Sequence, residues 1–345
     1  MAARFAPLSK GQIVTLAALA ALPLADLALP LVGIEPLQLA SASRTVVIFA
    51  VMALGLNIVV GWTGLLNLGI AAFAAVGAYA FGILTWENYP FQLGFWPGLL
   101  AAGAIGAVAG VLLGAPTLRL RGDYLAIVTL CFGEIVQDAL KNLEGITKGT
   151  QGINPLPAPA IPAAVVSSET PVLWFYLYLA ILAVVVVLCR NLEFSRLGRQ
   201  WFSVREDELA ARCMAIEPDK AKLKAFATGA ALAAIAGALS ASALSSTGEP
   251  ANYDFSVSIL ALCIVIVGGI GSITGVLVGS IVMIGLSNVA LPLASEKLQE
   301  AGIGSTSNVL TSPINYKYLL FGLALVVMMR YRPDGIVHSR KAVRK

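Results

Sequence analysis

Few side chains in this sequence are of the types that catalyse reactions or hold metal ions. The single histidine is His338, and the four cysteines stand apart from one another along the chain. A zinc site needs several histidine or cysteine ligands close together, and nucleophilic catalysis needs a base beside the nucleophile. No Gly-Lys dipeptide is present, so the chain has no phosphate-binding loop of the Walker A type. We expect no catalytic residue, no cofactor and no metal site.

Polar side chains within apolar segments form a second group of interest. Glu134 and Asp138 are four residues apart and would share one face of a helix. Carboxylates inside a membrane are costly and usually mark a polar path or a paired charge. Lys141 is placed to pair with Asp138, so both interpretations stay open. The milder polar candidates, either for a translocation path or for hydrogen bonds between helices, are Asn57, Thr63 and Asn67.

A charged stretch from Ser203 to Pro218 has the pattern of a short amphipathic helix. Ser203 and Glu206 have the spacing of a capping box, and residues 206–208 would place acidic groups in the first turn. Pro218 limits continuation of the helix. The positions that repeat at helical spacing and form one apolar face are Leu209, Cys213 and Ile216. Such a helix either docks into a groove on a partner protein or connects two membrane helices at the membrane surface.

The overall composition indicates the surroundings in which these residues lie. Of the 345 residues, 58% are hydrophobic and 12% are charged, whereas soluble domains carry roughly 25% charged residues. The apolar runs are continuous rather than alternating, and a helix needs about 20 apolar residues to cross a bilayer. We therefore predict an all-α integral membrane protein in which residues 1–345 form a single transmembrane domain.

About ten membrane-spanning helices are expected from the apolar runs. They are 12–33, 43–61, 66–85, 96–116, 122–141, 172–190, 221–245, 256–269, 273–293 and 316–330. We expect the first to be a retained helix rather than a cleaved signal peptide. With the N-terminus in the cytoplasm, 18 of the 23 lysines and arginines fall on the cytoplasmic side, as the positive-inside rule requires. The C-terminus is then also cytoplasmic.

The net charge of +4 therefore reflects topology, so we expect membrane lipid around the chain and no nucleic acid as a partner. Between the spans lie a charged cytoplasmic loop at 191–220 and two outer loops at 142–171 and 294–315. Two glycine clusters, at 61–69 and 268–275, have similar spacing. They indicate either an internal repeat or glycine-rich turns between closely packed helices.

Six segments, spread over nearly the whole chain, have sequences that one family of membrane proteins shares. They are NIVVGWTGLLNLGIAAFAAVGAY (57–79), LRLRGDYLAIVTLCFGEIV (118–136), TKGTQGI (147–153), REDELAA (205–211), GGIGSITGVLVG (268–279) and RPDG (332–335). Together they resemble the M-type membrane permease subunits of branched-chain amino-acid ABC importers. The chain departs from the usual family pattern at Ala215, where glycine is common, and at Ile70, where the family often has histidine in LGHAAF.

The resemblance implies a ten-helix bundle like that of the type II ABC importers, located in the bacterial inner membrane. It implies a homologous second permease subunit, two cytoplasmic ABC ATPase subunits that hydrolyse the ATP, and an extracytoplasmic substrate-binding protein received by the outer loops. The residues that the resemblance assigns to the ATPase-coupling helix are Arg205, Glu206, Asp207, Glu208, Ala210, Ala211 and Ile216.

Two alternatives to this function stay open. Related permeases carry urea, amides or other amino acids, so the resemblance does not fix the substrate. A secondary carrier driven by an ion gradient is a different class, and it would need several paired charges within the membrane. The chain has few such charges.

Overall fold

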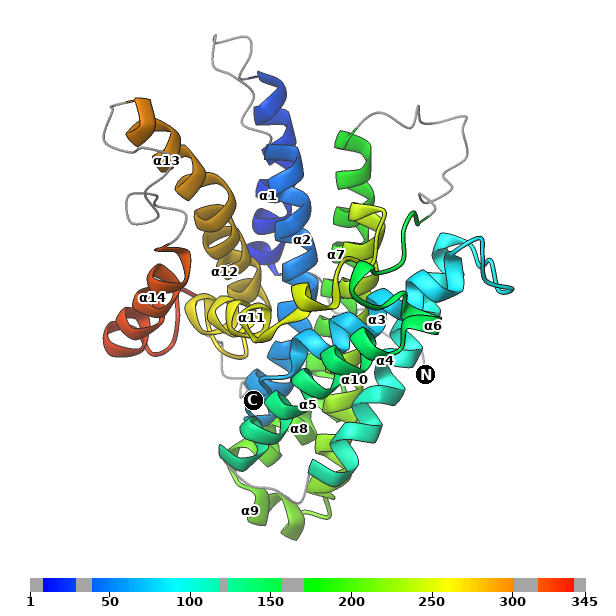
Figure 1. Cartoon of the computed structure of the whole chain (residues 1–345). Coiled ribbons are helices and arrows are strands. Elements are labelled where there is room, and N and C mark those ends of the chain that lie inside the picture. Colours follow the sequence, from blue (N-terminus) through cyan, green and yellow to red (C-terminus); the bar gives the residue numbers. More distant parts are fainter. Residues whose placement is uncertain (1–8, 29–38, 118–122, 157–170, 301–315, 338–345) are drawn as a thin grey trace.

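The computed structural model describes residues 9–28, 39–117, 123–156, 171–300 and 316–337, and the regular secondary structure of these residues is helical (Figure 1). The longer helices are α1 (Lys10–Ala28), α2 (Leu39–Asn57), α3 (Ile70–Thr85), α4 (Phe95–Thr117), α5 (Asp123–Asn142), α7 (Pro171–Phe194), α10 (Pro218–Leu244), α11 (Phe255–Gly268), α12 (Ile273–Gly285) and α14 (Lys317–Tyr331). The shorter ones are α6 (Glu144–Thr147), α8 (Arg196–Glu206), α9 (Glu208–Cys213) and α13 (Leu291–Glu300).

Each predicted span coincides with one of these longer helices, which confirms the all-α class. Within the described residues, six segments are long and apolar enough to cross a membrane. These are Ala42–Trp62, Phe95–Thr117, Trp174–Phe194, Pro218–Leu244, Pro250–Gly268 and Ile273–Glu296. Helices α1 and α3 contain shorter apolar stretches. The count of about ten crossings, like the type II importer arrangement, stays a prediction.

Two helices leave the regular α-helical path. A π-helical segment, Ile58–Trp62, continues α2, and another, Leu286–Ala290, joins α12 to α13. A π-helical turn inside an α-helix is uncommon and is often found at functional sites. The first of these segments is fully enclosed, since all five of its residues are buried.

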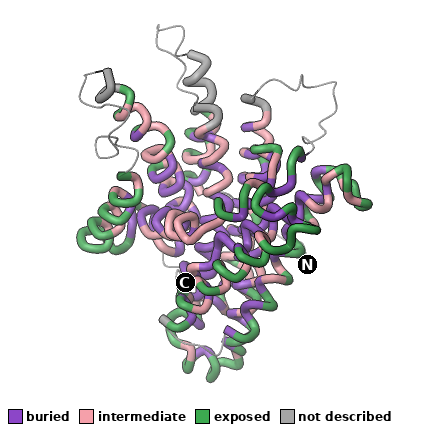
Figure 2. The backbone as a smooth tube through the Cα atoms, viewed as in Figure 1, coloured by how far each residue is buried: buried purple, intermediate pink, exposed green. Residues whose placement is uncertain are grey.

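Helix α10 lies at the centre of the bundle and packs closely against α2, α3 and α4. Small residues allow this approach: a Cβ atom added to Gly237 of α10 would lie 1.8 Å from the carbonyl oxygen of Ala74 on α3. At Gly77 of α3 an added Cβ would lie 2.1 Å from the carbonyl oxygen of Ala234. The two backbones therefore touch with no side chain between them, as small residues permit in membrane helices. Figure 2 shows buried residues gathered in the middle of the bundle.

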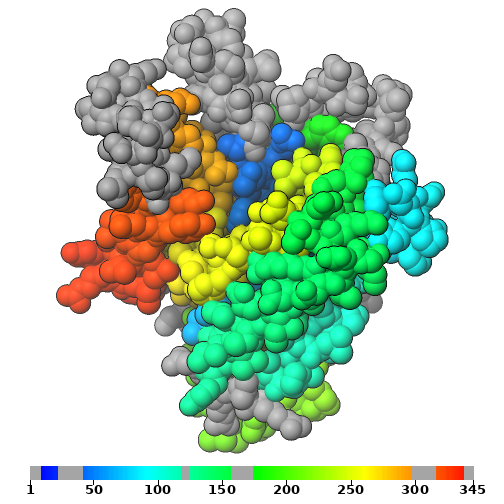
Figure 3. All heavy atoms as spheres, in the orientation of Figure 1, coloured from blue at the N-terminus to red at the C-terminus, as the bar shows by residue number. Residues whose placement is uncertain are grey.

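The outward faces of several helices carry large apolar side chains. Examples are Leu100 and Leu112 on α4 and Leu319, Leu323 and Val326 on α14, each more than half exposed. In the space-filling view, α5 runs obliquely across the front of the molecule, and α14 lies at its side (Figure 3). A face of this kind is stable against lipid tails, so lipid is its expected neighbour.

Helices α8 and α9 lie at one end of the bundle (Figure 1). The start of α1 is joined to the end of α7, just before α8, by a 2.6 Å hydrogen bond from Arg190 Nη1 to Gln12 Oε1. The backbone N–H groups of Ile336 and Val337 donate to the carbonyls of Val267 and Gly268 at the end of α11. Both ends of the described chain therefore lie toward the same end of the bundle.

Candidate functional site

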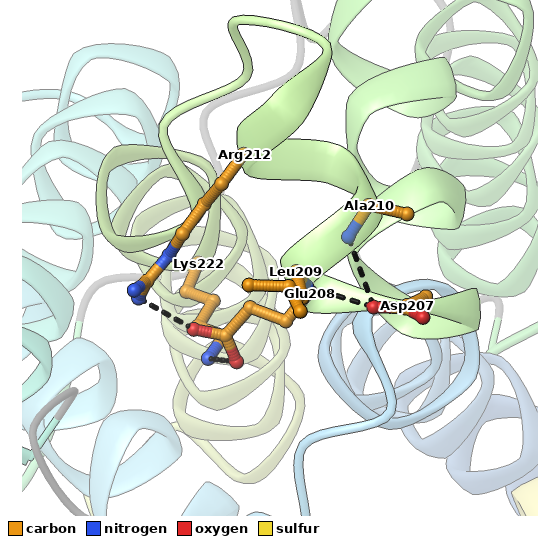
Figure 4. A network of polar contacts seen from close by, with 6 residues as sticks. All are labelled: Asp207, Glu208, Leu209, Ala210, Arg212 and Lys222. Atoms are coloured by element: carbon orange, nitrogen blue, oxygen red, sulfur yellow. Dashed lines mark hydrogen bonds and ion pairs between the residues drawn. The ribbon is translucent and has the colours of Figure 1, made fainter.

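The charged loop predicted at 191–220 folds into two consecutive helices. Ser195 caps α8 by accepting a hydrogen bond at its Oγ from the Gly198 N–H (3.2 Å). Trp201 and Val204 point from α8 into the protein and are buried. At the start of α9, Asp207 Oδ1 accepts from the N–H groups of Leu209 (2.8 Å) and Ala210 (3.0 Å), as Figure 4 shows. Each helix is thus capped by a residue type that favours helix starts.

The predicted capping box is wrong, because the capping residue is Asp207, four residues after Ser203. That residue lies inside α8, where its hydroxyl donates to the carbonyl of Arg199 (2.9 Å). Glu206 is the last residue of α8 rather than part of the first turn of α9. Asp207 has extended backbone angles and supplies the cap, which leaves Glu208 as the acidic residue of the first turn.

The end of α9 is a Schellman motif. The N–H of Ile216 donates to the carbonyl of Ala211 and the N–H of Ala215 to that of Arg212, both at 3.1 Å. Ile216 lies beyond the helix and packs partly buried against the core. The predicted three-residue apolar face is therefore wrong at this position. Its other two residues, Leu209 and Cys213, are exposed, and so is Met214.

The Schellman motif places Ala215 at φ +59°, in the left-handed region. An L-residue with a Cβ pays roughly 1–2 kcal/mol there, and glycine avoids most of that cost. We expect Ala215→Gly to stabilise the α9 turn by about 1 kcal/mol. The measurement is the rate of limited proteolysis after Arg212 in the folded protein, which should fall. An Ala211→Gly change in the regular part of α9 is the control and should raise that rate.

Glu208 is held by two cations. Its Oε1 accepts from Arg212 Nη2 at 2.9 Å and its Oε2 from Lys222 Nζ at 2.7 Å (Figure 4). Lys222 belongs to α10 and its side chain is only 9% exposed. An ammonium group removed from water needs a carboxylate partner. Glu208 therefore anchors α9 to the central helix and does not point out toward a partner protein.

Arg205 and Trp201 connect α8 to the π-helical end of α2. The guanidinium of Arg205 donates to the carbonyl of Gly61. The rings of Trp62 and Trp201 stack with centroids 5.9 Å apart, and Phe202 lies 6.0 Å from Trp62. Stacked aromatic pairs of this kind add to the stability given by burial alone. The loop is thus fixed to the bundle at a second point.

The two glycine clusters meet at this same place. Asn57 Oδ1 accepts from the N–H of Gly271 (2.8 Å), and Trp62 Nε1 donates to the carbonyl of Gly271 (3.2 Å). A Cβ atom on Gly61 would lie 2.8 Å from the Cα of Gly271. The clusters are turns packed backbone against backbone, which is one of the two predicted interpretations. The π-helical segment Ile58–Trp62 and the glycine-rich turn at Gly271, which are far apart in the sequence, therefore form a single junction with α8.

The polar candidates for a translocation path are not brought together. Asn57, Thr63 and Asn67 are buried, and Thr63 Oγ1 donates to the carbonyl of Val59 (2.6 Å) while Asn67 Oδ1 accepts from the N–H of Gly69 (2.9 Å). Glu134 and Asp138 lie on the exposed face of α5. Asp138 accepts from Lys141 at 3.3 Å, the pair expected from the sequence. A path-lining role for these residues stays a prediction.

At the opposite end of the bundle, the segment TKGTQGI is a packed part of the fold. Ile153 and Thr247 join the loop after α5 to the loop after α10. The N–H of Thr247 donates to the carbonyl of Ile153 (3.2 Å), and the N–H of Ile153 donates to Thr247 Oγ1 (2.8 Å). Tyr79 of α3 adds a hydrogen bond to the carbonyl of Gly248 (3.0 Å). The remainder of the predicted outer loop, at 157–170, lies outside the described residues, as does 301–315 of the second outer loop.

Sequence reasoning missed two of the residues that hold α8 and α9 to the bundle, Lys222 and Trp201. Lys222 is the second residue of the predicted span 221–245. A cation at such a position needs a carboxylate partner. That signal was available in the sequence. Trp201 had no such signal, because its stacking partner is 139 positions away and only the fold brings the two rings together.

Six apolar helical segments long enough to cross a bilayer within the described residues, with apolar side chains on their outer faces, indicate a multi-pass membrane protein. A family model described as "Branched-chain amino acid transport system / permease component" matches residues 38–329. The chain belongs to this permease family.

Individual relatives agree with this assignment. The high-affinity branched-chain amino acid transport system permease protein LivM of Salmonella typhimurium is 38% identical over 311 residues, covering 84% of this chain and 68% of the relative. The probable branched-chain amino acid transport permease protein LivM of Methanocaldococcus jannaschii is 25% identical over 86% of this chain and 92% of its own length. The permease protein LivH of Salmonella typhimurium is 23% identical over 84% of this chain and 91% of its own length. No solved structure matches the chain.

Proposed function

We propose that this chain is the transmembrane permease subunit of an ATP-driven ABC importer that carries branched-chain or related amino acids across the bacterial inner membrane. The relatives named LivM and LivH are permease proteins of high-affinity branched-chain amino acid transport systems, which supports this substrate class. Separate ATPase subunits would hydrolyse the ATP. The observation that carries the proposal is the α8–α9 unit, which is anchored to the bundle on its inner side and exposes Leu209 and Met214 on its outer side.

The anchored side of this unit suits it to transmit movement. Arg205 attaches it to the π-helical end of α2 and Glu208 attaches it to α10. Ala211, on the inner face of α9, is buried. A movement of α9 would therefore be transmitted to the central helices, because α8 and α9 are attached to them at two points. Helix packing of this kind supports rigid-body transitions.

The outer side of the unit suits a partner protein. Leu209 is 72% exposed and Met214 76% exposed, and Glu206, three residues before Leu209, is exposed too. Apolar side chains on a short helix with a charged edge fit a groove on another protein. We propose that a cytoplasmic ABC ATPase subunit provides that groove, and that Ala210, which is exposed next to Leu209, lets the two surfaces approach.

The remaining assembly is part of the same proposal. The importer would contain two such ATPases, a homologous second permease and an extracytoplasmic substrate-binding protein. The similarity to both LivM and LivH supports two related permeases. Since both ends of the described chain lie toward the end that carries α8 and α9, cytoplasmic N- and C-termini follow from a cytoplasmic coupling unit.

Copurification tests the coupling role directly. A tagged chain should bring down an ABC ATPase from native membranes, and Leu209→Asp should abolish this, because a carboxylate would enter the apolar groove. Leu244→Asp is the matched control, since Leu244 is 68% exposed but lies at the other end of α10. It should leave the ATPase bound. Equal loss in both variants contradicts the assignment of α9 as the docking element.

Uptake by the purified complex in vesicles tests the substrate class. ATP-dependent uptake of leucine, compared with glutamate and urea, should favour leucine. Uptake by this chain alone, driven by an ion gradient, would overturn the proposal in favour of a secondary carrier.

A further inference from the structure

A cavity of about 320 Å³ lies between α2, α11, α14 and the π-helical segment Leu286–Ala290. Its lining comes from the first half of α2 and from the starts of α11 and α14. Asn57 at the end of α2 and Trp62 in the π-helical segment that follows contact the Gly271 turn between α11 and α12. The cavity and the α8–α9 unit therefore lie toward opposite ends of the same helices.

The cavity has two charged groups of opposite sign on different elements. Asp254 stands at the start of α11 and Lys317 at the start of α14. Among the residues that the structure describes, they do not form an ion pair with each other or with a third residue. The ammonium of Lys317 lies 4.8 Å from the ring centroid of Tyr318. Its three N–H donors have no carboxylate partner there.

The carboxylate of Asp254 has acceptor capacity left over. Its Oδ1 accepts from the N–H of Val257 (3.3 Å), which caps α11, and its Oδ2 accepts from Ser256 Oγ (2.8 Å). A carboxylate has about four acceptor positions. The two used ones fix the orientation of the group, and the others remain for a cation.

Apolar side chains form another part of the lining. Phe49 of α2, Leu260 of α11, Ile284 of α12 and Phe321 of α14 contribute to it. A polar lining is costly against lipid. This cavity has a negative group, a positive group and an apolar region. It therefore matches a small molecule that has a positive group, a negative group and an apolar part. Its volume falls within the range of about 300–1,000 Å³ that small-molecule sites have.

We propose that this cavity binds a zwitterionic aliphatic amino acid on its way through the permease. The α-ammonium group is held by Asp254, the α-carboxylate by Lys317, and the aliphatic side chain lies against Phe49, Leu260 and Phe321. This assignment rests on the proposed transport function and adds a binding site to it. The other occupant that the cavity could have is a side chain of a second permease, and the experiment separates the two.

Photo-leucine, the diazirine analogue of leucine, probes the site directly. Illumination of the complex with photo-leucine should label peptides that contain 251–260 or 317–321, and excess leucine should compete. Leucinamide and 4-methylpentanoate, each lacking one charge, should compete at least about tenfold more weakly, as expected for a lost charge-assisted hydrogen bond.

Two variants test the charges. Asp254→Asn keeps a residue that caps α11 well and removes the negative charge, and Lys317→Gln removes the positive one. Each should raise the leucine concentration needed for half-maximal competition by roughly tenfold to a hundredfold. Lys317→Arg should keep most of the affinity. Glu249→Gln changes an exposed carboxylate outside the cavity and should have no effect.

The outcomes separate this inference from the proposed function. ATP-driven leucine uptake by the wild-type complex, together with no labelling of these peptides or unchanged competition in both charge variants, overturns the binding site alone. Loss of the second permease from the Asp254→Asn and Lys317→Gln complexes also overturns it, in favour of an interface between permeases. If the wild-type complex takes up no amino acid, the proposed function itself fails.

Discussion

The Gly237→Ala variant is expected to lose the packed bundle, although only one methyl group is added. The new Cβ would lie 1.8 Å from the carbonyl oxygen of Ala74, and backbone atoms cannot move aside as a side chain can. Helices α3 and α10 would have to separate, and α10 also packs on α2 and α4. We expect destabilisation of about 3 kcal/mol or more, at the upper end of the range for overpacking. The fraction of protein that stays monodisperse after heating in detergent measures this.

Gly133→Ala is the matched control for that result. Gly133 lies inside α5, and an added Cβ there would meet nothing within 4 Å. Since alanine favours a helix over glycine, this variant should gain up to about 1 kcal/mol. The same chemical change thus has opposite signs at the two positions. A loss of equal size at Gly133 would mean that the effect comes from glycine itself and not from the crossing of α3 and α10.

Glu208→Gln is expected to detach α9 from the bundle and to stop transport. The ammonium of Lys222 would remain in a site where its side chain is 9% exposed, with no carboxylate beside it. Leaving one charge of such a pair unpaired costs at least about 2 kcal/mol. Trypsin should then cut after Arg205 and Arg212 at least about tenfold faster, because the segment opens more often. ATP-dependent uptake by the complex should fall in parallel.

Glu217→Gln provides the comparison for Glu208. Glu217 accepts from Lys220 at the same 2.7 Å, but both side chains are about two-thirds exposed. An exposed pair contributes about 0–1 kcal/mol, so this variant should behave like the wild type. Adding Lys222→Met to Glu208→Gln should restore part of the trypsin resistance, since no buried charge is then left unpaired. No recovery in the double variant would show that Glu208 acts through something other than Lys222.

The positions of the helices could be predicted from the sequence because long apolar runs are a local property. The start of α9 could not, because two capping patterns overlap within five residues. Ser203 and Glu206 satisfy the capping box by type and spacing, and Asp207 satisfies the simple cap. The choice depends on α8 continuing through Ser203, which follows from the burial of Trp201 and Val204 against the bundle.

The junction between α8 and the glycine-rich turns shows the same limit at longer range. The sequence identifies Gly61 and Gly271 as members of two similar clusters, but these residues are 210 positions apart. Their contact depends on how α2 packs against α11 and α12. The contact that holds Glu208 could not be predicted for a related reason, since its partner Lys222 lies across the chain turn that joins α9 to α10.

The π-helical segment at Ile58–Trp62 sets the direction in which Trp62 points. One residue turns an α-helix by about 100°, and a π-helical turn accommodates one residue more than a regular turn. If the same residues formed a regular α-helix instead, the indole would be rotated by about a quarter of a circle away from Trp201 and the Gly271 carbonyl. The extra residue is therefore taken up within this one turn, and the π-helical conformation sets the angle between α2 and the loop end that carries Trp62.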